Sequence, residues 1–126
     1  MKKQEKLSNE QIFEAIKAAY AATDDKMGED ILVLDISGIS PIADYFLIAS
    51  ANNSNQLKAM ADFVEEKLAA VGMHVRHVEG AQTARWILMD FGYIIVHLFH
   101  REEREFYRLE KVWGDARNIE HDELVQ

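Results

Sequence analysis

Two pairs of histidines have a spacing that could serve metal binding. His74 and His77 are three residues apart, and so are His97 and His100. On a helix this spacing puts both imidazoles on one face, whereas on a strand it puts them on opposite faces. Both pairs lie in or next to segments that we expect to be strands, so we predict no joint metal site. We interpret His97, which has apolar neighbours, as a half-buried strand histidine.

Three aspartates offer a second chemistry. Asp35, Asp44 and Asp90 stand near the ends of predicted strands, where carboxylates could hold Mg²⁺ for nucleotide chemistry. The predicted strands contain no pair of carboxylates two positions apart, and the sequence has no glycine-rich phosphate-binding loop. We therefore expect these aspartates to cap turns. A nucleotide-binding or nucleotidyltransferase-like enzyme is the alternative hypothesis.

The apolar stretch over residues 86–100 must position several of these groups. We predict strands over Trp86–Asp90 and Ile94–Phe99, joined by a tight turn at Phe91 and Gly92. The second strand is apolar on both faces, so it should lie inside a sheet that is covered on both sides. In the first strand, Trp86 and Asp90 share one face. Neither half is long enough to span a membrane.

The rest of the chain predicts alternating helices and strands. Helical periodicity and capping residues indicate helices over about 9–23, 56–71 and 102–113, and apolar runs indicate strands over 31–36, 44–50 and 73–78. The segment from residue 44 to residue 78 has the form of a βαβ crossover with parallel strands. We predict an α/β (α+β) fold: a single domain with a mixed sheet of about five strands flanked by helices.

Composition limits the classes of function. The chain has 126 residues, 48% of them hydrophobic, and a net charge of −8. This charge argues against a protein that mainly grips nucleic-acid backbone, but it suits docking onto a basic protein. The chain has no cysteine and no signal-peptide pattern near Met1, so we expect a cytoplasmic protein.

The residues after Gly114 carry four acidic side chains against one basic side chain. We therefore divide the chain into a domain over residues 1–114 and an acidic C-terminal tail over residues 115–126. We expect this tail to be partly disordered.

An ordered set of motifs resembles one known family. It covers Glu79-Gly80, Trp86–Asp90 with Gly92, Val96-His97, and Arg104-x-Phe-Tyr107-x-Leu-Glu110-x-x-Trp113. Together with Asp44–Ile48 and Gln56-x-x-Ala59, these residues resemble the Iojap-related ribosomal silencing factors over about residues 7–116.

The resemblance implies a fold similar in outline to nucleotidyltransferases but without their catalytic residues. It implies a non-enzymatic protein without a cofactor, which binds the large ribosomal subunit through ribosomal protein fourteen. Binding there would block joining of the small subunit and repress translation under nutrient limitation. It implies neither a membrane partner nor sequence-specific nucleic-acid binding.

The family motifs also assign candidate partner-binding residues. The assigned residues are Trp86, Asp90, Tyr107 and Glu110, followed by Glu79 and His97. The chain departs from the family pattern at Ala51, Asn55 and Tyr93, where the family often has Gly, Arg and Asp, so contacts of that Arg or Asp cannot be transferred. The outer face of the predicted hairpin could also pair with a second copy of the chain.

Overall fold

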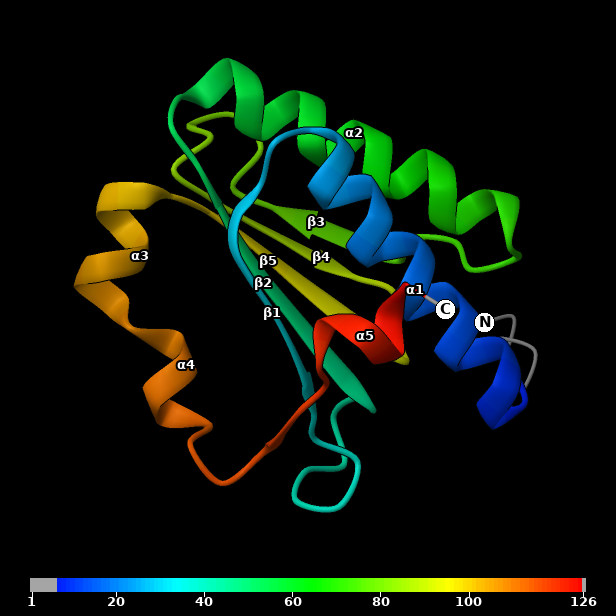
Figure 1. Ribbon diagram of the computed structural model, residues 1–126. Coiled ribbons are helices and arrows are strands. Elements are labelled where there is room, and N and C mark those ends of the chain that lie inside the picture. The colour runs from blue at the N-terminus through cyan, green and yellow to red at the C-terminus, as the bar shows by residue number, and fades with distance from the viewer. Residues whose placement is uncertain (1–6, 126) are drawn as a thin grey trace.

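The computed structural model describes residues 7–125, apart from the side chains of Phe106 and Glu110. Its helices are α1 (Asn9–Asp25), α2 (Ser54–Ala70), α3 (Arg101–Tyr107), α4 (Leu109–Val112) and α5 (His121–Leu124). Its strands are β1 (Glu29–Asp35), β2 (Tyr45–Ala51), β3 (His77–Glu79), β4 (Trp86–Asp90), β5 (Ile94–His100) and β6 (Arg117–Asn118). Figure 1 shows one sheet with helices on both of its sides.

The sheet is mixed, as the sequence predicts. Its order is β3-β4-β5-β2-β1-β6, with β2 and β5 parallel and all other neighbouring pairs antiparallel. The hairpin of β4 and β5 is confirmed, and β5 lies inside the sheet with buried residues on both faces. The sheet has six strands rather than about five, because residues 117–118 pair with the end of β1.

The crossover through α2 differs in detail from the predicted unit. β3 covers only His77–Glu79, not residues 73–78, and it forms one edge of the sheet. It runs in the same direction as β2, as predicted, but β4 and β5 lie between the two strands. The β4–β5 hairpin, which comes later in the chain, therefore lies between β3 and β2.

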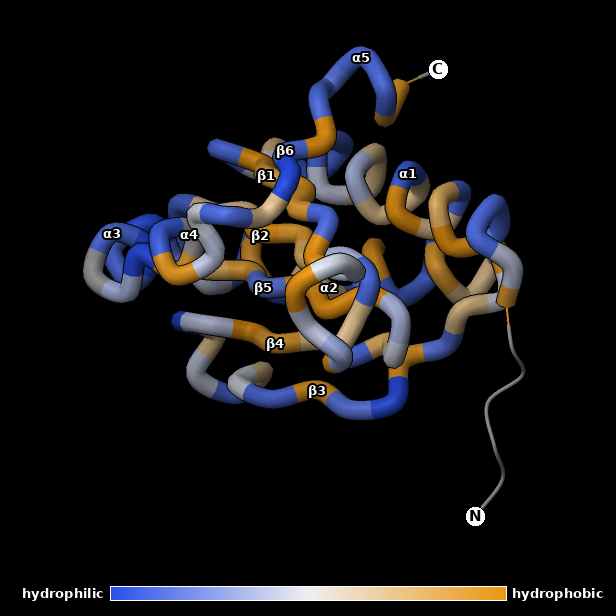
Figure 2. Tube along the Cα trace, turned by 90° about the horizontal axis from the view of Figure 1, so that it is seen from below, coloured by the Kyte–Doolittle hydropathy of each residue, from blue (hydrophilic) through white to orange (hydrophobic). Residues whose placement is uncertain are grey.

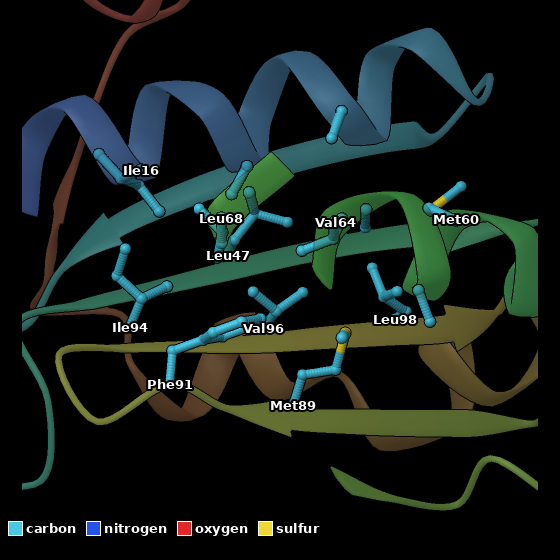
Figure 3. Packing of buried hydrophobic residues seen from close by; sticks show 14 of the residues in the cluster. Ile16, Leu47, Met60, Val64, Leu68, Met89, Phe91, Ile94, Val96 and Leu98 are labelled. Atoms are coloured by element: carbon cyan, nitrogen blue, oxygen red, sulfur yellow. The ribbon is translucent and has the colours of Figure 1, made fainter. Parts of the chain in front are cut away.

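Helices α1 and α2 cover one face of the sheet. A Ser8 capping box begins α1, and the Asn53 side chain caps α2. Their apolar stripes pack on inward side chains of the central strands, including fully buried Leu47 and Val96 (Figure 3). Since this packing removes apolar surface from water, it is the main source of the domain's stability.

The opposite face is covered by α3, α4 and the segment that follows them (Figure 1). A second, smaller core lies there, built on Phe46, Ile48 and Phe99, with Leu109 and Trp113 packed against it. The predicted continuous helix over residues 102–113 is wrong. It is broken at Arg108, whose backbone is left-handed with a φ of 49°.

The expectation of a partly disordered tail is also wrong. After Gly114 the chain adds β6 to the sheet and then forms α5, where Ile119 and Leu124 are buried against the α1 side. The Tyr20 hydroxyl of α1 lies 2.6 Å from His121 Nδ1, which ties α5 to α1. Two apolar residues within an acidic segment were enough to fold it. Among residues 7–125, no helix is long and apolar enough to cross a bilayer.

Candidate functional site

An aromatic cluster lies on the sheet face opposite α1 and α2. It consists of Trp86, His97, Phe99 and Tyr107. The Trp86 indole stacks on the Phe99 ring at a centroid distance of 4.8 Å, and the Tyr107 ring lies 4.9 Å from Trp86. Trp86 is half-buried and Tyr107 is 47% exposed. The cluster therefore presents large aromatic area that is held in place by the sheet.

The backbone around Trp86, the first residue of β4, fixes the position of its side chain. Trp86 lies opposite Phe99 in the β4–β5 pairing, so both side chains leave the same face of the sheet. The loop before β4 passes close to this point at Gly80, which has a φ of 83°. A Cβ atom at Gly80 would collide with the Trp86 carbonyl group. Only glycine allows this approach without strain.

His97 is a buried member of the cluster. The Trp86 indole N–H donates to His97 Nδ1 at 3.2 Å, so the neutral imidazole carries its proton on Nε2. That Nε2 atom is buried and has no hydrogen-bond partner among the described residues. Burial lowers the pKa of His97 to about 4, which keeps the ring uncharged at neutral pH. His97 is 5% exposed, and its hydrogen bond helps to position the Trp86 indole.

An arginine links the start of β4 to the start of α3. Arg85 Nη2 donates to Glu103 at 2.7 Å and to Glu102 at 3.0 Å. These hydrogen bonds raise the pKa of the Arg85 guanidinium and lower the pKa of the Glu102 carboxyl. Both glutamates lie in the first turn of α3, where negative charge favours the helix N-terminus. The structure shows that they also hold α3, and with it Tyr107, next to Trp86.

Asp90 and Glu79 lie on the same side of the sheet as Trp86 but away from the cluster. Asp90 is four residues along β4, about 13 Å from Trp86 at the rise of a strand. Its carboxylate accepts a hydrogen bond from the Gly92 N–H at 2.8 Å and so caps the hairpin turn. Glu79 pairs in register with Leu88, and its carboxylate lies 2.8 Å from the exposed His77 ring.

The six predicted residues therefore fall into three groups. Trp86, His97 and Tyr107 come together in the aromatic cluster, whereas Asp90 lies at the hairpin end of β4 and Glu79 on the edge strand β3. Glu110 belongs to α4, and its side chain lies outside the described residues. Sequence reasoning missed Phe99 and Arg85. The register of the hairpin could have pointed to Phe99, because it lies directly opposite Trp86.

Two of the three strand-end aspartates, Asp35 and Asp90, cap turns, as the sequence favours. Asp35 Oδ1 accepts hydrogen bonds from the Ser37 N–H at 3.0 Å and the Ser37 hydroxyl at 2.7 Å. Burial, and then the charge of Asp35, raise the pKa of the Asp44 carboxyl. The part of the chain that the structure describes contains no group of three or more His, Asp or Glu side chains that could hold a metal ion.

Relatives of known name share this fold and sequence. Residues 9–126 match the family described as "Ribosomal silencing factor during starvation". The chain is 50% identical to the ribosomal silencing factor of Bacillus subtilis over 101 residues, which cover 80% of this chain and 86% of that protein. It is 34% identical to the chloroplastic protein Iojap of Arabidopsis thaliana, over 84% of this chain and 44% of the plant protein.

Solved structures agree with this relationship. A crystal structure of a protein from Chromobacterium violaceum has a TM-score of 0.79 at 33% identity, and the match covers 82% of this chain and 86% of the other. One from Bacillus halodurans has a TM-score of 0.75 at 37% identity, covering 85% of this chain and 97% of the other. From the sequence match and the shared fold, we conclude that this chain belongs to the family of ribosomal silencing factors.

Proposed function

We propose that the protein binds the large ribosomal subunit through ribosomal protein fourteen and thereby prevents joining of the small subunit. On this proposal it acts in the cytoplasm, without catalysis, and represses translation when nutrients are limiting. The observation that carries the proposal is the aromatic cluster. Half-buried Trp86 and exposed Tyr107 pack against each other, and aromatic residues of this kind commonly supply most of the binding energy in protein interfaces.

The surroundings of the cluster suit a protein partner. Half-buried Leu88 and Ile95 lie next to it on the same face of the sheet, and Asp90 and Glu79 add carboxylates at the margin. An apolar centre with a polar margin is the usual organisation of a protein interface. The margin carboxylates would meet basic side chains of the partner.

Sedimentation tests the proposal directly. Purified large subunits are incubated with the protein, small subunits are added, and the mixture is separated on a sucrose gradient. We expect the protein to sediment with large subunits and to lower the joined fraction as its concentration rises. If it neither sediments with large subunits nor changes the joined fraction, the proposed function is wrong.

The same gradient, run without ribosomes, reports on self-association. A second copy could occupy the partly apolar surface of the hairpin when no ribosome is present. Such a dimer would compete with ribosome binding, because both would need the same surface. We would then expect the free protein to sediment as a dimer and the Trp86→Ala variant as a monomer.

A further inference from the structure

A hollow of about 650 Å³ separates α3 and α4 from the start of β1. Its helical wall carries four basic side chains and one acidic side chain, namely Arg101, Arg104, Arg108 and Lys111 against Glu105. The chain has 14 basic residues in all, so this wall concentrates positive charge within an acidic protein. The hollow lies on the same helical segment as Tyr107, and α3 is coloured mostly as hydrophilic in Figure 2.

In the described part of the chain, no carboxylate lies within salt-bridge distance of three of these cations. Arg101, Arg108 and Lys111 are exposed, and within residues 7–125 none of them forms a salt bridge. Arg101 donates only to the Asn52 side-chain oxygen, at 3.3 Å, and Arg108 only to the Glu105 carbonyl, at 3.2 Å. Their charge is therefore available to a ligand.

The backbone holds these cations in place. Arg108 adopts the left-handed conformation that breaks the helix, and Asp30 on the opposite wall also has a φ of 49°. For a non-glycine residue such conformations cost free energy and tend to cluster at functional sites. At the base of the hollow, 7%-exposed Arg104 donates to the Ser50 hydroxyl and the Glu29 carbonyl, both at 3.4 Å.

The opposite wall limits what the ligand can be. Glu29 and Asp30 of β1 line it, so an anion cannot fill the whole hollow without repulsion. An RNA backbone fits both walls, because its phosphates can meet the basic helices while its 2′-hydroxyl groups donate to carboxylates. Arg101 begins α3 and Lys111 lies in α4, ten residues further along the chain, which allows contact with more than one phosphate.

We infer that Arg101, Arg108 and Lys111 bind an RNA backbone of the large ribosomal subunit next to the docking site of the aromatic cluster. This inference rests on the proposed function and adds a second kind of contact to it. The cations position the protein and read no sequence, because they meet phosphates rather than bases. The net charge of −8 argues against RNA binding as the main source of affinity, but it allows a local contact of this size.

The salt dependence of large-subunit binding tests the inference. The triple variant Arg101→Gln, Arg108→Gln, Lys111→Gln removes the three exposed cations and leaves buried Arg104 in place. Arg76→Gln is the matched control, because Arg76 is exposed and also forms no salt bridge among the described residues. We expect the slope of log affinity against log salt to fall by about 2 in the triple variant, and to stay unchanged in the control.

Hydroxyl-radical footprinting of the large-subunit RNA identifies the partner. At saturating protein concentration, we expect the wild type to protect a short RNA segment that the triple variant leaves open. An unchanged salt slope overturns the inference while the proposed function stands. A reduced slope without RNA protection also overturns it, because the cations would then meet an acidic protein. If the wild type does not bind large subunits at all, both proposals fail.

Discussion

The two faces of the sheet are built on different principles. On the face toward α1 and α2, the inward side chains of the central strands are almost completely buried, as Leu47 and Val96 show. On the other face, a short broken helical segment covers part of the sheet and leaves Trp86 half-buried. The first face therefore stabilises the fold, whereas the second leaves apolar surface exposed that a partner could cover.

Charge is divided in a similar way. Residues 7–75, which include α1 and α2, carry eleven acidic and four basic side chains. Residues 76–113, which include the aromatic cluster, carry six of each. The acidic surplus thus belongs mainly to residues 7–75, although Glu29 and Asp30 of this segment line the hollow beside α3 and α4. Net charge can aid approach to a basic partner over a distance, but local contacts must decide how the protein binds.

The largest expected effect compares one leucine from each face. Leu47→Ala should reduce the free energy of unfolding by about 3 kcal/mol, because it opens a cavity in the fully covered core. Leu88→Ala on the half-open face should cost less than about 1.5 kcal/mol, since Leu88 is already partly exposed. Urea denaturation measures both values. Equal losses would contradict the distinction between the faces.

The pH dependence of the free energy of unfolding tests how far His97 is buried on the half-open face. Its folded pKa of about 4 lies below the ordinary value of 6.5, so the unfolded chain takes up a proton first as pH falls. The stabilising contribution of the neutral ring is complete above pH 6.5 and is lost progressively between pH 6.5 and pH 4. The total loss should be about 3 kcal/mol.

Urea denaturation at several pH values checks the His97 prediction. His97→Gln removes the titration, so its stability should vary less over this range than that of the wild type. His74→Gln, at an exposed histidine, is the control and should follow the wild type. Parallel curves for His97→Gln and the wild type would show that burial of His97 does not disfavour its charged form.

The smallest expected effect concerns the link between β4 and α3. Arg85→Gln removes the pairing with Glu102 and Glu103 but leaves the cores intact. Because these groups are exposed, global stability should change little. Amide hydrogen exchange in α3 should become faster, while exchange in α2 should not change. Unaltered exchange in α3 would mean that the helix is held by its apolar contacts alone.

Periodic apolar patterns predicted well the elements of the sheet face that α1 and α2 cover. The α1 and α2 helices, the β4–β5 hairpin and the buried position of β5 all follow from local pattern and capping residues. The pairing of β2 with β5 could not be predicted this way, since it joins strands separated by a helix and two other strands. The break at Arg108 was also missed, because nothing in its residue type favours a left-handed backbone.

The candidate site was predicted in part. Alternation along β4 places Trp86 and Asp90 on one face, and this is confirmed. The distance between them shows that a shared face does not bring residues into contact. The role of the six residues in partner binding stays a prediction. The link from Arg85 to α3 depends on how two elements pack together, which a pattern within one element does not report.

Binding of Trp86→Ala to purified large subunits tests the central claim most directly. We predict a loss of about 2–4 kcal/mol in binding free energy, which is about thirtyfold or more in affinity. Circular dichroism should confirm that the variant is folded, and Tyr107→Ala provides a second, more exposed position in the cluster. Phe63→Ala on α2 is the control, because it removes a half-buried ring on the other side of the sheet. Wild-type affinity in folded Trp86→Ala and Tyr107→Ala would contradict the claim that the aromatic cluster docks on the ribosome.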